Sequence, residues 1–254
     1  MQITGNMILI TGGGSGIGRG LAEAFHKLGN QVIIAGRRKQ VLDETTAANP
    51  GMKSAILNIE DAKSIREFAA QMAADYPSLN VLINNAGIMK MEKLLSQQEN
   101  LEDAEATITT NLLGPIRLTA ALLPLFQKQP HATIMTVSSG LAFLPLAMTP
   151  TYCATKAAIH SYTLSLRYQL QKSNIEVLEL APPYVATGLT DQSANDPRAM
   201  PLADFLSEVM EIIKTQPTPN EILVERVKQL RFAEKSGHFD AAFKGLNEAM
   251  AGDH

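Results

Sequence analysis

Three side chains in the middle of the chain have the types and the spacing of a proton-transfer site. Tyr152 and Lys156 lie four residues apart in a segment predicted to be helical, so their side chains share one face of that helix. A phenol titrates near pH ~10 and transfers protons poorly at neutral pH, but a neighbouring ammonium stabilises the phenolate and lowers its pKa. Ser139, at the end of the preceding strand, can hold a substrate oxygen against the phenol. These residues predict acid–base chemistry at an oxygen atom.

The Tyr–Lys spacing is not sufficient by itself, because it occurs again at Tyr168 and Lys172. The second pair lies later in the same predicted helix, and no strand-end serine precedes it. We therefore interpret the second pair as surface residues. Cys153, next to Tyr152, is interpreted as a small buried helix residue and not as a reactive thiol.

A glycine-rich turn near the start of the chain predicts a second function, the binding of a dinucleotide. Residues 11–18 read Thr-Gly-Gly-Gly-Ser-Gly-Ile-Gly and connect a short apolar strand to an amphipathic helix. A helix N-terminus offers free N–H groups and partial positive charge to a pyrophosphate, and glycine lets the backbone approach the anion. The residues predicted to contact the cofactor in this turn are Gly12, Gly14, Ser15, Gly16, Ile17 and Gly18.

Strand and helix patterns alternate through most of the chain and place these motifs. Apolar strands are predicted at residues 7–10, 32–35, 54–57, 81–83, 134–137 and 176–180, with helices between them, of which the longest cover 101–127 and 151–172. Continuous apolar strands that alternate with helices indicate an α/β fold of the Rossmann type, a doubly wound parallel sheet with helices on both faces. We expect six strands, or seven if a further strand forms in a less familiar way.

The regular alternation ends after residue 183. Residues 188–216 are predicted to form a substrate lid, a polar loop followed by a helix. Residues 219–250 are predicted to form a helical C-terminal segment, whose first helix has Thr218 as its N-cap and Pro219 at the next position. Since neither a linker-like stretch nor a repeat interrupts the pattern, residues 1–254 are predicted to be a single domain.

The composition excludes several classes of protein. The chain has 254 residues, of which 45% are apolar and 19% charged, with a net charge of −3, and this composition suits one soluble domain that does not bind nucleic acid. No apolar run approaches the ~20 residues of a membrane span, and nothing resembles a signal peptide. The single cysteine fits a reducing compartment, and the five scattered histidines lack metal-ligand spacing. We expect a cytoplasmic protein without a metal.

Five motifs in register resemble the short-chain dehydrogenase/reductase family in its compact form. They are the glycine turn, residues 84–87 (Asn-Asn-Ala-Gly), Asn111, Ser139, and Tyr152 with Lys156. Ser139 precedes Tyr152 by thirteen residues, as in the family, and this register supplies the support that the Tyr–Lys spacing lacks. The resemblance covers about residues 5–188 and implies reversible hydride transfer between a nicotinamide and a carbonyl carbon.

The resemblance also implies a role for each motif. Tyr152 is the acid for reduction and the base for oxidation, and Ser139 orients the carbonyl. Lys156 lowers the pKa of the tyrosine and holds the ribose hydroxyls, while the backbone of Asn111, in a kinked helix, holds a water that relays protons. Two positions depart from the family pattern, with Asn58 in place of an aspartate and Pro183 in place of a glycine. The further cofactor contacts that the resemblance implies come from Asn58, Ile59, Asn85, Ala86, Gly87, Tyr152, Lys156, Pro182, Val185 and Thr187.

The residues after the second strand indicate which nicotinamide cofactor binds. An NAD enzyme usually has an acidic residue there for the ribose 2′-hydroxyl, but this chain has Arg37, Arg38 and Lys39. A guanidinium matches a 2′-phosphate with two hydrogen bonds. The sequence therefore favours NADP(H) and leaves NAD(H) open.

The apolar loops near Tyr152 predict a hydrophobic ketone or aldehyde as substrate, which makes the protein a carbonyl reductase. A homodimer or homotetramer through the two long helices is expected, although the unusual C-terminal segment puts a tetramer in doubt. The alternatives are an NAD-dependent alcohol dehydrogenase, a non-catalytic NADP-sensing protein, and a sugar-nucleotide epimerase or dehydratase, which needs a larger substrate domain. The residues predicted to line the substrate site are Ser139, Leu141, Phe143, Leu144, Tyr184 and Leu189.

Overall fold

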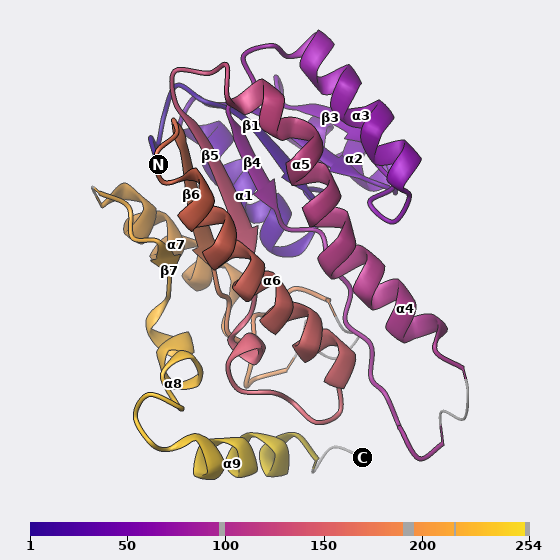
Figure 1. Ribbon diagram of the computed structural model, residues 1–254, viewed down its shortest axis with the longest axis vertical. Helices are drawn as coiled ribbons and strands as arrows, with labels where there is room; N and C mark the ends of the chain where they lie inside the picture. Colours follow the sequence, from indigo (N-terminus) through magenta and orange to yellow (C-terminus); the bar gives the residue numbers. More distant parts are fainter. Residues whose placement is uncertain (97–99, 190–195, 216, 252–254) are drawn as a thin grey trace.

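The computed structural model describes residues 1–96, 100–189, 196–215 and 217–251. Within these residues the strands form one parallel sheet of seven strands, in the order β3-β2-β1-β4-β5-β6-β7 (Figure 1). The strand order reverses between β1 and β4, so the predicted doubly wound sheet is confirmed. The strands are β1 (Met7–Thr11), β2 (Gln31–Gly36), β3 (Lys53–Ile56), β4 (Val81–Asn84), β5 (Ala132–Val137), β6 (Ile175–Leu180) and β7 (Glu221–Ile222).

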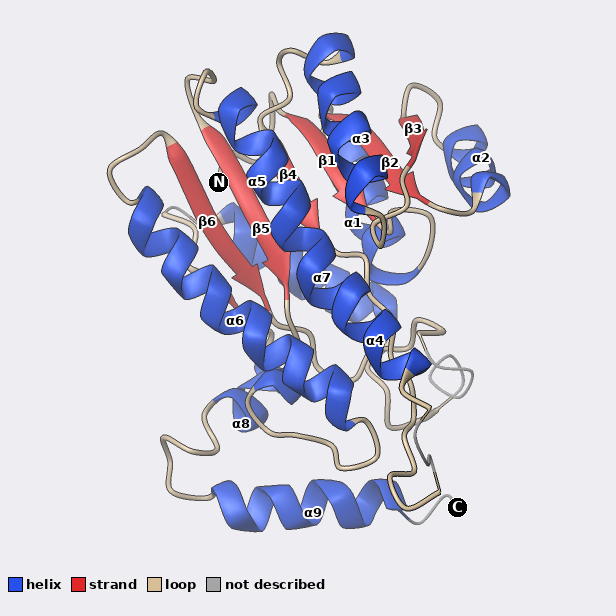
Figure 2. Cartoon of the chain, turned by 45° about the vertical axis from the view of Figure 1, so that its right-hand side comes forward, coloured by secondary structure: helices blue, strands red, loops and turns tan. Residues whose placement is uncertain are grey.

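Helices cover both faces of the sheet because both faces of its strands are apolar. On one face, α1 (Gly16–Lys27), α2 (Lys39–Ala48) and α7 (Leu202–Lys214) share a core with the strands. On the other face lie α3 (Ala62–Asp75), α5 (Gly114–Phe126) and α6 (Pro150–Leu170), as Figure 2 shows. The central strand residues of β1 and β4 are buried almost completely. Because these strands are parallel, their carboxyl ends lie together at one end of the sheet, and the predicted site residues follow them.

The predicted helix 101–127 is interrupted in its middle. It consists of α4 (Glu102–Ile108), a π-helical turn η1 (Thr109–Leu113) and α5. Gly114 follows this turn and lies against Ile59, whose Cγ1 would be 2.6 Å from a Cβ at position 114. The predicted kink is therefore a π turn, and its tight contact with the segment after β3 requires glycine.

The stretch Glu102–Phe126 is also long and apolar enough, by length and composition alone, to cross a membrane. In the fold, its side chains Leu118, Leu122 and Phe126 pack in the core between the sheet and α3. The apolarity of this stretch is thus explained by a position inside the domain.

The C-terminal part corrects the sequence prediction. The residues predicted to start a helix at Thr218 instead lead into strand β7, because the backbone N–H groups of Glu179 and Ala181 donate to the carbonyl oxygens of Asn220 and Ile222. Pairing with an open sheet edge outweighs the local helix signal. After β7 come a 3₁₀ turn, η3 (Glu225–Val227), and the helices α8 (Lys228–Arg231) and α9 (Phe239–Ala251).

The predicted lid 188–216 is described only in part, since residues 190–195 and 216 lie outside the described residues. Its helical half is α7, which packs against α1. The contact is close at Gly20, where a Cβ would lie 2.2 Å from Cδ1 of Leu206. Glycine at this position lets α7 approach the helix that follows the glycine turn.

Candidate active site

The predicted catalytic side chains meet at the carboxyl end of β5. Ser139 follows β5 and is the N-cap of a short 3₁₀ turn, η2 (Gly140–Ala142), while Tyr152 and Lys156 lie on the first turns of α6. Asn111 lies in the π turn η1. All four side chains are buried, with at most 8% of each residue exposed. The structure therefore brings together, in one dry region, residues separated by 45 positions in the sequence.

Lys156 is held by the strand that precedes it. Its Nζ donates a hydrogen bond of 2.9 Å to the carbonyl oxygen of Val137, the last residue of β5. Burial lowers the pKa of Lys156 to about 8, and the negative charge of Glu179 opposes this fall. A lysine with such a pKa carries its charge at neutral pH and can release a proton at mildly alkaline pH.

Burial has the opposite effect on Tyr152, whose pKa it raises to about 12, while hydrogen bonding with Ser139 opposes the rise. The sequence predicted a lowered pKa through Lys156. In the structure, the lysine Nζ bonds to Val137 and lies 5.6 Å from the centre of the tyrosine ring. The chain by itself therefore keeps the phenol protonated.

The side chain of Asn111 connects two segments around the lysine. Its Oδ1 accepts a hydrogen bond of 2.9 Å from the backbone N–H of Ile88, and its Nδ2 donates to the carbonyl oxygen of Ile88 at 2.8 Å. The same Nδ2 donates to Oγ1 of Thr155, beside Lys156. A Cβ on Gly87 would lie 3.3 Å from Oδ1 of Asn111 and 3.6 Å from Nζ of Lys156. Gly87 thus lets the loop after β4 pass close to both residues.

The glycine turn after β1 is fixed by the loop after β4. Oγ1 of Thr11 accepts hydrogen bonds from the backbone N–H groups of Asn85 and Ala86, and Nδ2 of Asn85 donates to the carbonyl oxygen of Thr11 at 2.9 Å. Gly12 has φ +66°, which favours glycine. A Cβ at Gly18 would lie 2.3 Å from Nδ2 of Asn85. The two predicted cofactor motifs therefore support each other.

This turn fits the pyrophosphate of a dinucleotide. Ser15 is the N-cap of α1 and makes no side-chain capping hydrogen bond, and no acidic residue lies in the first helical turn. The N-terminal N–H groups and the positive end of the helix dipole can therefore act on an anion. Thr187 lies beside the turn, since a Cβ on Gly16 would be 3.2 Å from its Cβ. The predicted contacts from Gly16 and Thr187 are thus adjacent in space.

The basic residues after β2 have unequal surroundings. Nη1 of Arg37 forms an ion pair of 2.6 Å with Oε1 of Glu60, which also accepts a hydrogen bond from Oγ1 of Thr110. Oδ1 of Asn58 accepts the backbone N–H of Glu60. Arg38, the N-cap residue of α2, is exposed, and it has no ion pair within the part of the chain that the structure describes. Arg38 is therefore the more available guanidinium.

The apolar surroundings of Tyr152 come partly from the C-terminus, which the sequence did not predict. Tyr152, Leu146 and Cys153 form a small buried cluster. Partly buried side chains from three segments pack against it: Met89, Leu141, Met148, and Leu246 and Met250 of α9.

Polar contacts attach α9 to the loop before α6. Oδ1 of Asn247 accepts the backbone N–H of Ala147 at 2.6 Å, and its Nδ2 donates to the carbonyl oxygen of Pro145. Nη1 of Arg198, from the segment before α7, donates to the carbonyl oxygen of Ala249 at 2.9 Å. Helix α9 runs below the N-terminal end of α6 (Figure 1). It therefore covers the Tyr152 side of the site.

The other predicted substrate-lining residues lie in different surroundings. Phe143 packs edge-on against His160, with ring centres 4.7 Å apart, and lies under the guanidinium of Arg231. Leu144 is buried, and Leu189 is 45% exposed. The hydroxyl of Tyr184 donates to Oδ2 of Asp196. Of the predicted apolar lining, Leu141 packs against the Tyr152 cluster.

The remaining predicted cofactor contacts follow β6. The carbonyl oxygen of Pro182 accepts the backbone N–H of Gly140, next to Ser139. Val185 is buried and forms a parallel β-bridge with Met200. Ile59, from the segment after β3, is also buried, against Gly114. These contacts fix the backbone around the site.

Comparison with known proteins identifies the family. Residues 6–198 match the family model described as short chain dehydrogenase. The chain belongs to the short-chain dehydrogenase family. It is thus an oxidoreductase of that family, and the predicted resemblance is confirmed.

Relatives of this short-chain dehydrogenase extend the match. It is 40% identical to a Bacillus subtilis protein described as uncharacterized oxidoreductase DltE, over 97% of this chain and 98% of the relative. It is 31% identical to the NADP-dependent 3-hydroxy acid dehydrogenase YdfG of Shigella flexneri, over 69% of this chain and 71% of the relative. A solved short-chain dehydrogenase from Streptomyces avermitilis superimposes with a TM-score of 0.81 and 25% identity, over 99% of this chain and 100% of that one.

The sequence motifs of this short-chain dehydrogenase did not reveal that its C-terminal helix packs at the site, and this helix lies outside the family match. Helix α9 begins at residue 239, beyond residue 198. The available signal was its own pattern, in which Leu246 and Met250 lie four residues apart on one helical face. That pattern predicts packing but does not name the partner.

Proposed function

We propose that the protein is an NADP(H)-dependent carbonyl reductase, which reversibly reduces an apolar ketone or aldehyde to the alcohol. The observation that carries this proposal is the meeting of the Tyr152 and Ser139 hydroxyls, with the ammonium of Lys156 one helical turn away. Each of these residues is buried, so the charge of Lys156 acts through a weakly screening medium.

The nicotinamide supplies the hydride in reduction and accepts it in oxidation. In reduction, the Ser139 hydroxyl holds the substrate oxygen, and Tyr152 gives its proton to that oxygen. The charge of Lys156 then stabilises the phenolate. Since burial raises the pKa of Tyr152 to about 12, the phenol is protonated at neutral pH and ready to act as the acid. In the oxidation direction the same tyrosine must first lose this proton before it can act as the base.

Three observations support the NADP(H) preference. The chain has no carboxylate among the residues that directly follow β2. Arg38 is exposed there and is the more available of the two guanidinium groups. The relative YdfG is described as NADP-dependent. NAD-dependent alcohol oxidation is the alternative, and Glu60 beside Arg37 is the feature that favours it.

The apolar substrate class is supported by the cluster around Tyr152. Three methionines and three leucines pack there, and methionine side chains adapt to varied apolar shapes. The side chains that pack there are apolar, and they suit an apolar ketone or aldehyde.

A homodimer through the two long helices is part of the proposal. Ile108 and Leu113, on the α4–η1 stretch, and Leu164 and Tyr168, on α6, are exposed apolar residues. The two helical stretches lie side by side (Figure 2). A second copy of the chain would cover these side chains. A cytoplasmic location, which the sequence predicted, also belongs to this proposal.

The test is NADPH oxidation with a panel of apolar ketones and aldehydes. Tyr152→Phe is expected to lower kcat by at least ~10²-fold while NADPH still binds, because the general acid is lost. Tyr168→Phe, in the second Tyr–Lys pair, is the matched control and is expected to keep full activity, since Tyr168 lies sixteen residues, or about 24 Å, along α6 from Tyr152. Equal turnover by Tyr152→Phe and the unmodified enzyme would contradict the proposal.

A further inference from the structure

The carboxylate of Glu179 is buried in β6, the strand next to the edge strand β7. Glu179 lies in β6 between Leu178 and Leu180, and none of its surface is exposed. One oxygen, Oε2, contacts Nδ1 of His160 at 2.8 Å. The other, Oε1, has no hydrogen-bond partner within the described residues. A buried carboxylate is costly unless other charges compensate it, so its surroundings need an explanation.

Glu179 faces the helix that carries the catalytic pair. Tyr152, Lys156 and His160 follow one another at intervals of four residues on α6, so their side chains form a row on one face of the helix. His160, at the end of this row, contacts Glu179.

The pairing of β5 with β6 brings Glu179 close to Lys156. The carbonyl oxygen of Val137, which accepts from Nζ of Lys156, belongs to the residue paired with Leu180 in β6. Glu179 is the residue before Leu180. The ammonium and the carboxylate therefore lie in the same buried layer between α6 and the sheet.

The charged groups of this layer come from α6, β6, β7 and α8, and of these Glu221 of β7 and Arg231 of α8 lie on the Glu179 side. From α6, the titratable groups that face Lys156 are Tyr152 and His160, and from β6 it is Glu179. The loop after β4 and the π turn contribute Gly87 and Asn111, which are uncharged. The charge of Glu179 opposes the effect of burial on the pKa of Lys156.

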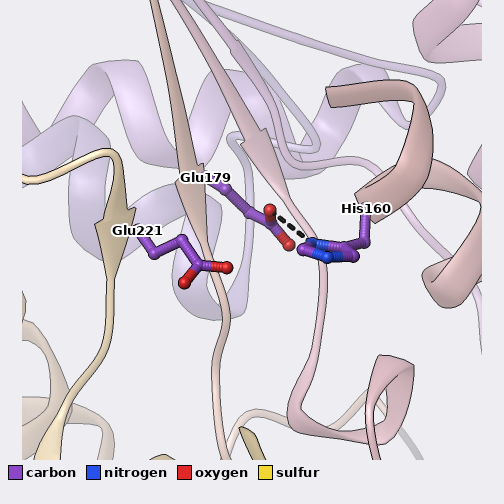
Figure 3. Close-up of side chains that lie close together, drawn as sticks. All are labelled: His160, Glu179 and Glu221. Atoms are coloured by element: carbon purple, nitrogen blue, oxygen red, sulfur yellow. Dashed lines mark hydrogen bonds and ion pairs between the residues drawn. The ribbon is translucent and has the colours of Figure 1, made fainter. Parts of the chain in front are cut away.

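The neighbouring Glu221 has a different partner. It pairs with Glu179 across β6 and β7, and the side chains of His160, Glu179 and Glu221 lie close together (Figure 3). Oε1 and Oε2 of Glu221 accept hydrogen bonds from Nε and Nη2 of Arg231, at 3.0 and 3.2 Å.

These three residue types could ligate a cation, but their present contacts favour another explanation. Nδ1 of His160 is already bonded to Glu179, and the guanidinium of Arg231 already compensates Glu221 and would repel a metal ion. Within the described residues Glu179 is left as a buried carboxylate without a guanidinium partner, in the layer that contains Lys156.

We propose that Glu179, held in place by His160, is a positioning residue whose negative charge keeps Lys156 in its ammonium form at neutral pH. The proposal rests on the proposed function only for the use of that ammonium in catalysis. The protonation of Lys156 itself is measurable without any substrate.

The experiment is an NMR titration of the full chain labelled with ¹³C-lysine, with the Lys156 signal assigned by its loss in Lys156→Met. In Glu179→Gln the titration midpoint of Lys156 is expected to fall from about 8 by at least roughly 1 pH unit, because a neighbouring opposite charge is removed. Glu225→Gln, which neutralises an exposed carboxylate paired with Lys228, is the control and is expected to leave the midpoint unchanged.

A second variant keeps the test open if Glu179→Gln does not fold. His160→Asn leaves the carboxylate but removes the hydrogen bond that holds it, so a smaller fall of the midpoint is expected. An unchanged midpoint in the folded variants would overturn the proposal. Stoichiometric binding of Zn²⁺ that Glu179→Gln abolishes would also overturn it, in favour of a metal site.

The kinetic readout separates this proposal from the proposed function. If the midpoint falls in Glu179→Gln but no ketone or aldehyde is reduced by the unmodified enzyme, the positioning role stands and the proposed function fails. If both hold, the pH profile of kcat in Glu179→Gln is expected to shift while KM for the ketone stays within about twofold, which a purely structural defect would not produce.

Discussion

The Nζ of Lys156 and the carbonyl oxygen of Val137 are joined by a hydrogen bond of 2.9 Å in the buried layer between α6 and the sheet. This neutral acceptor satisfies one of the three N–H donors of the ammonium. The fall of the lysine pKa from 10.5 to about 8 corresponds to roughly 3 kcal/mol of destabilisation of the charged form. At neutral pH the site therefore keeps Lys156 charged, although burial disfavours the charged form.

Replacing this lysine is expected to stabilise the fold. Because the native pKa lies below the ordinary value, the unfolded chain binds more protons between pH 8 and 10.5, and stability rises with pH across that window. Lys156→Met is therefore expected to raise Tm by a few degrees at pH 7, although part of the gain is lost because Glu179 loses a neighbouring cation. The difference should shrink above pH 8 and vanish near pH 10.5.

Thermal unfolding of both proteins at pH 7 and pH 10 checks this prediction. Lys214→Met, at an exposed lysine paired with Glu211, is the control and is expected to change Tm little at either pH. A Tm difference for Lys156→Met that is the same at both pH values would show that the buried charge is not its cause.

A methyl group at Gly18 is expected to disrupt the cofactor site. A Cβ there would lie 2.3 Å from Nδ2 of Asn85 and 2.4 Å from the carbonyl oxygen of Gly12, so the glycine turn and the loop after β4 must separate. Gly18→Ala is expected to weaken NADPH binding at least ~10-fold and to lower Tm. Binding is measured by fluorescence titration.

Gly245→Ala is the matched control for the glycine prediction. Gly245 lies in α9, and a Cβ there would meet nothing within 4 Å, so alanine should stabilise the helix by up to about 1 kcal/mol. Normal NADPH affinity in Gly18→Ala would refute the close packing of the two motifs.

The cofactor preference is expected to depend on Arg38 more than on Arg37. Arg38→Asp should lower the ratio of kcat/KM for NADPH to that for NADH by at least ~10-fold, because a guanidinium for the 2′-phosphate is replaced by a repelling carboxylate. Arg37→Asp should lower the ratio less, since Arg37 is already paired with Glu60. Glu60→Gln should raise the ratio by freeing Arg37.

Lys39→Asp provides the control, because Lys39 is paired with Asp43 on the surface of α2. It is expected to leave the ratio within about twofold. The NADP(H) assignment would be wrong if Arg37→Asp and Arg38→Asp both left the ratio unchanged.

The C-terminal helix is expected to contribute to substrate affinity. Leu246 and Met250 pack against the Tyr152 cluster, so the double variant Leu246→Ser, Met250→Ser should raise KM for apolar ketones by about 10-fold. KM for NADPH should stay the same, because α9 contacts the Tyr152 cluster and the loop before α6. Lys244→Ser, on the exposed side of the same helix, is the control, and a similar KM rise in that control would contradict the prediction.

Local patterns were enough to predict the first six strands of the sheet and most of the residues that meet in the site. The glycine turn, Ser139, Tyr152 and Lys156 were predicted from spacing, because each lies at a strand end or on one helical face, whereas Asn111 was predicted from the resemblance to the family. The exposed Tyr168 also agrees with its interpretation as a surface residue. Cys153 is buried as expected.

What sequence patterns could not give were contacts between distant segments. Strand β7 forms because residues 220–222 pair with the open edge of β6. A local helix pattern cannot show that this edge is available. The ion pair of Arg37 with Glu60 and the packing of Leu246 beside Tyr152 likewise join segments far apart in the chain. For Glu179, the available signal was a carboxyl group between two leucines of β6, Leu178 and Leu180.

The π turn at Thr109–Leu113 determines which face of α5 points toward the sheet, because α5 follows it without a break. Deleting one of its five residues would restore α-helical spacing and rotate α5 by about 100° about its axis. Gly114 would then turn away from Ile59, and Leu118 and Leu122 would leave the core. The length of this segment is consequently fixed to the single residue, whereas surface loops elsewhere can change length without such a global effect.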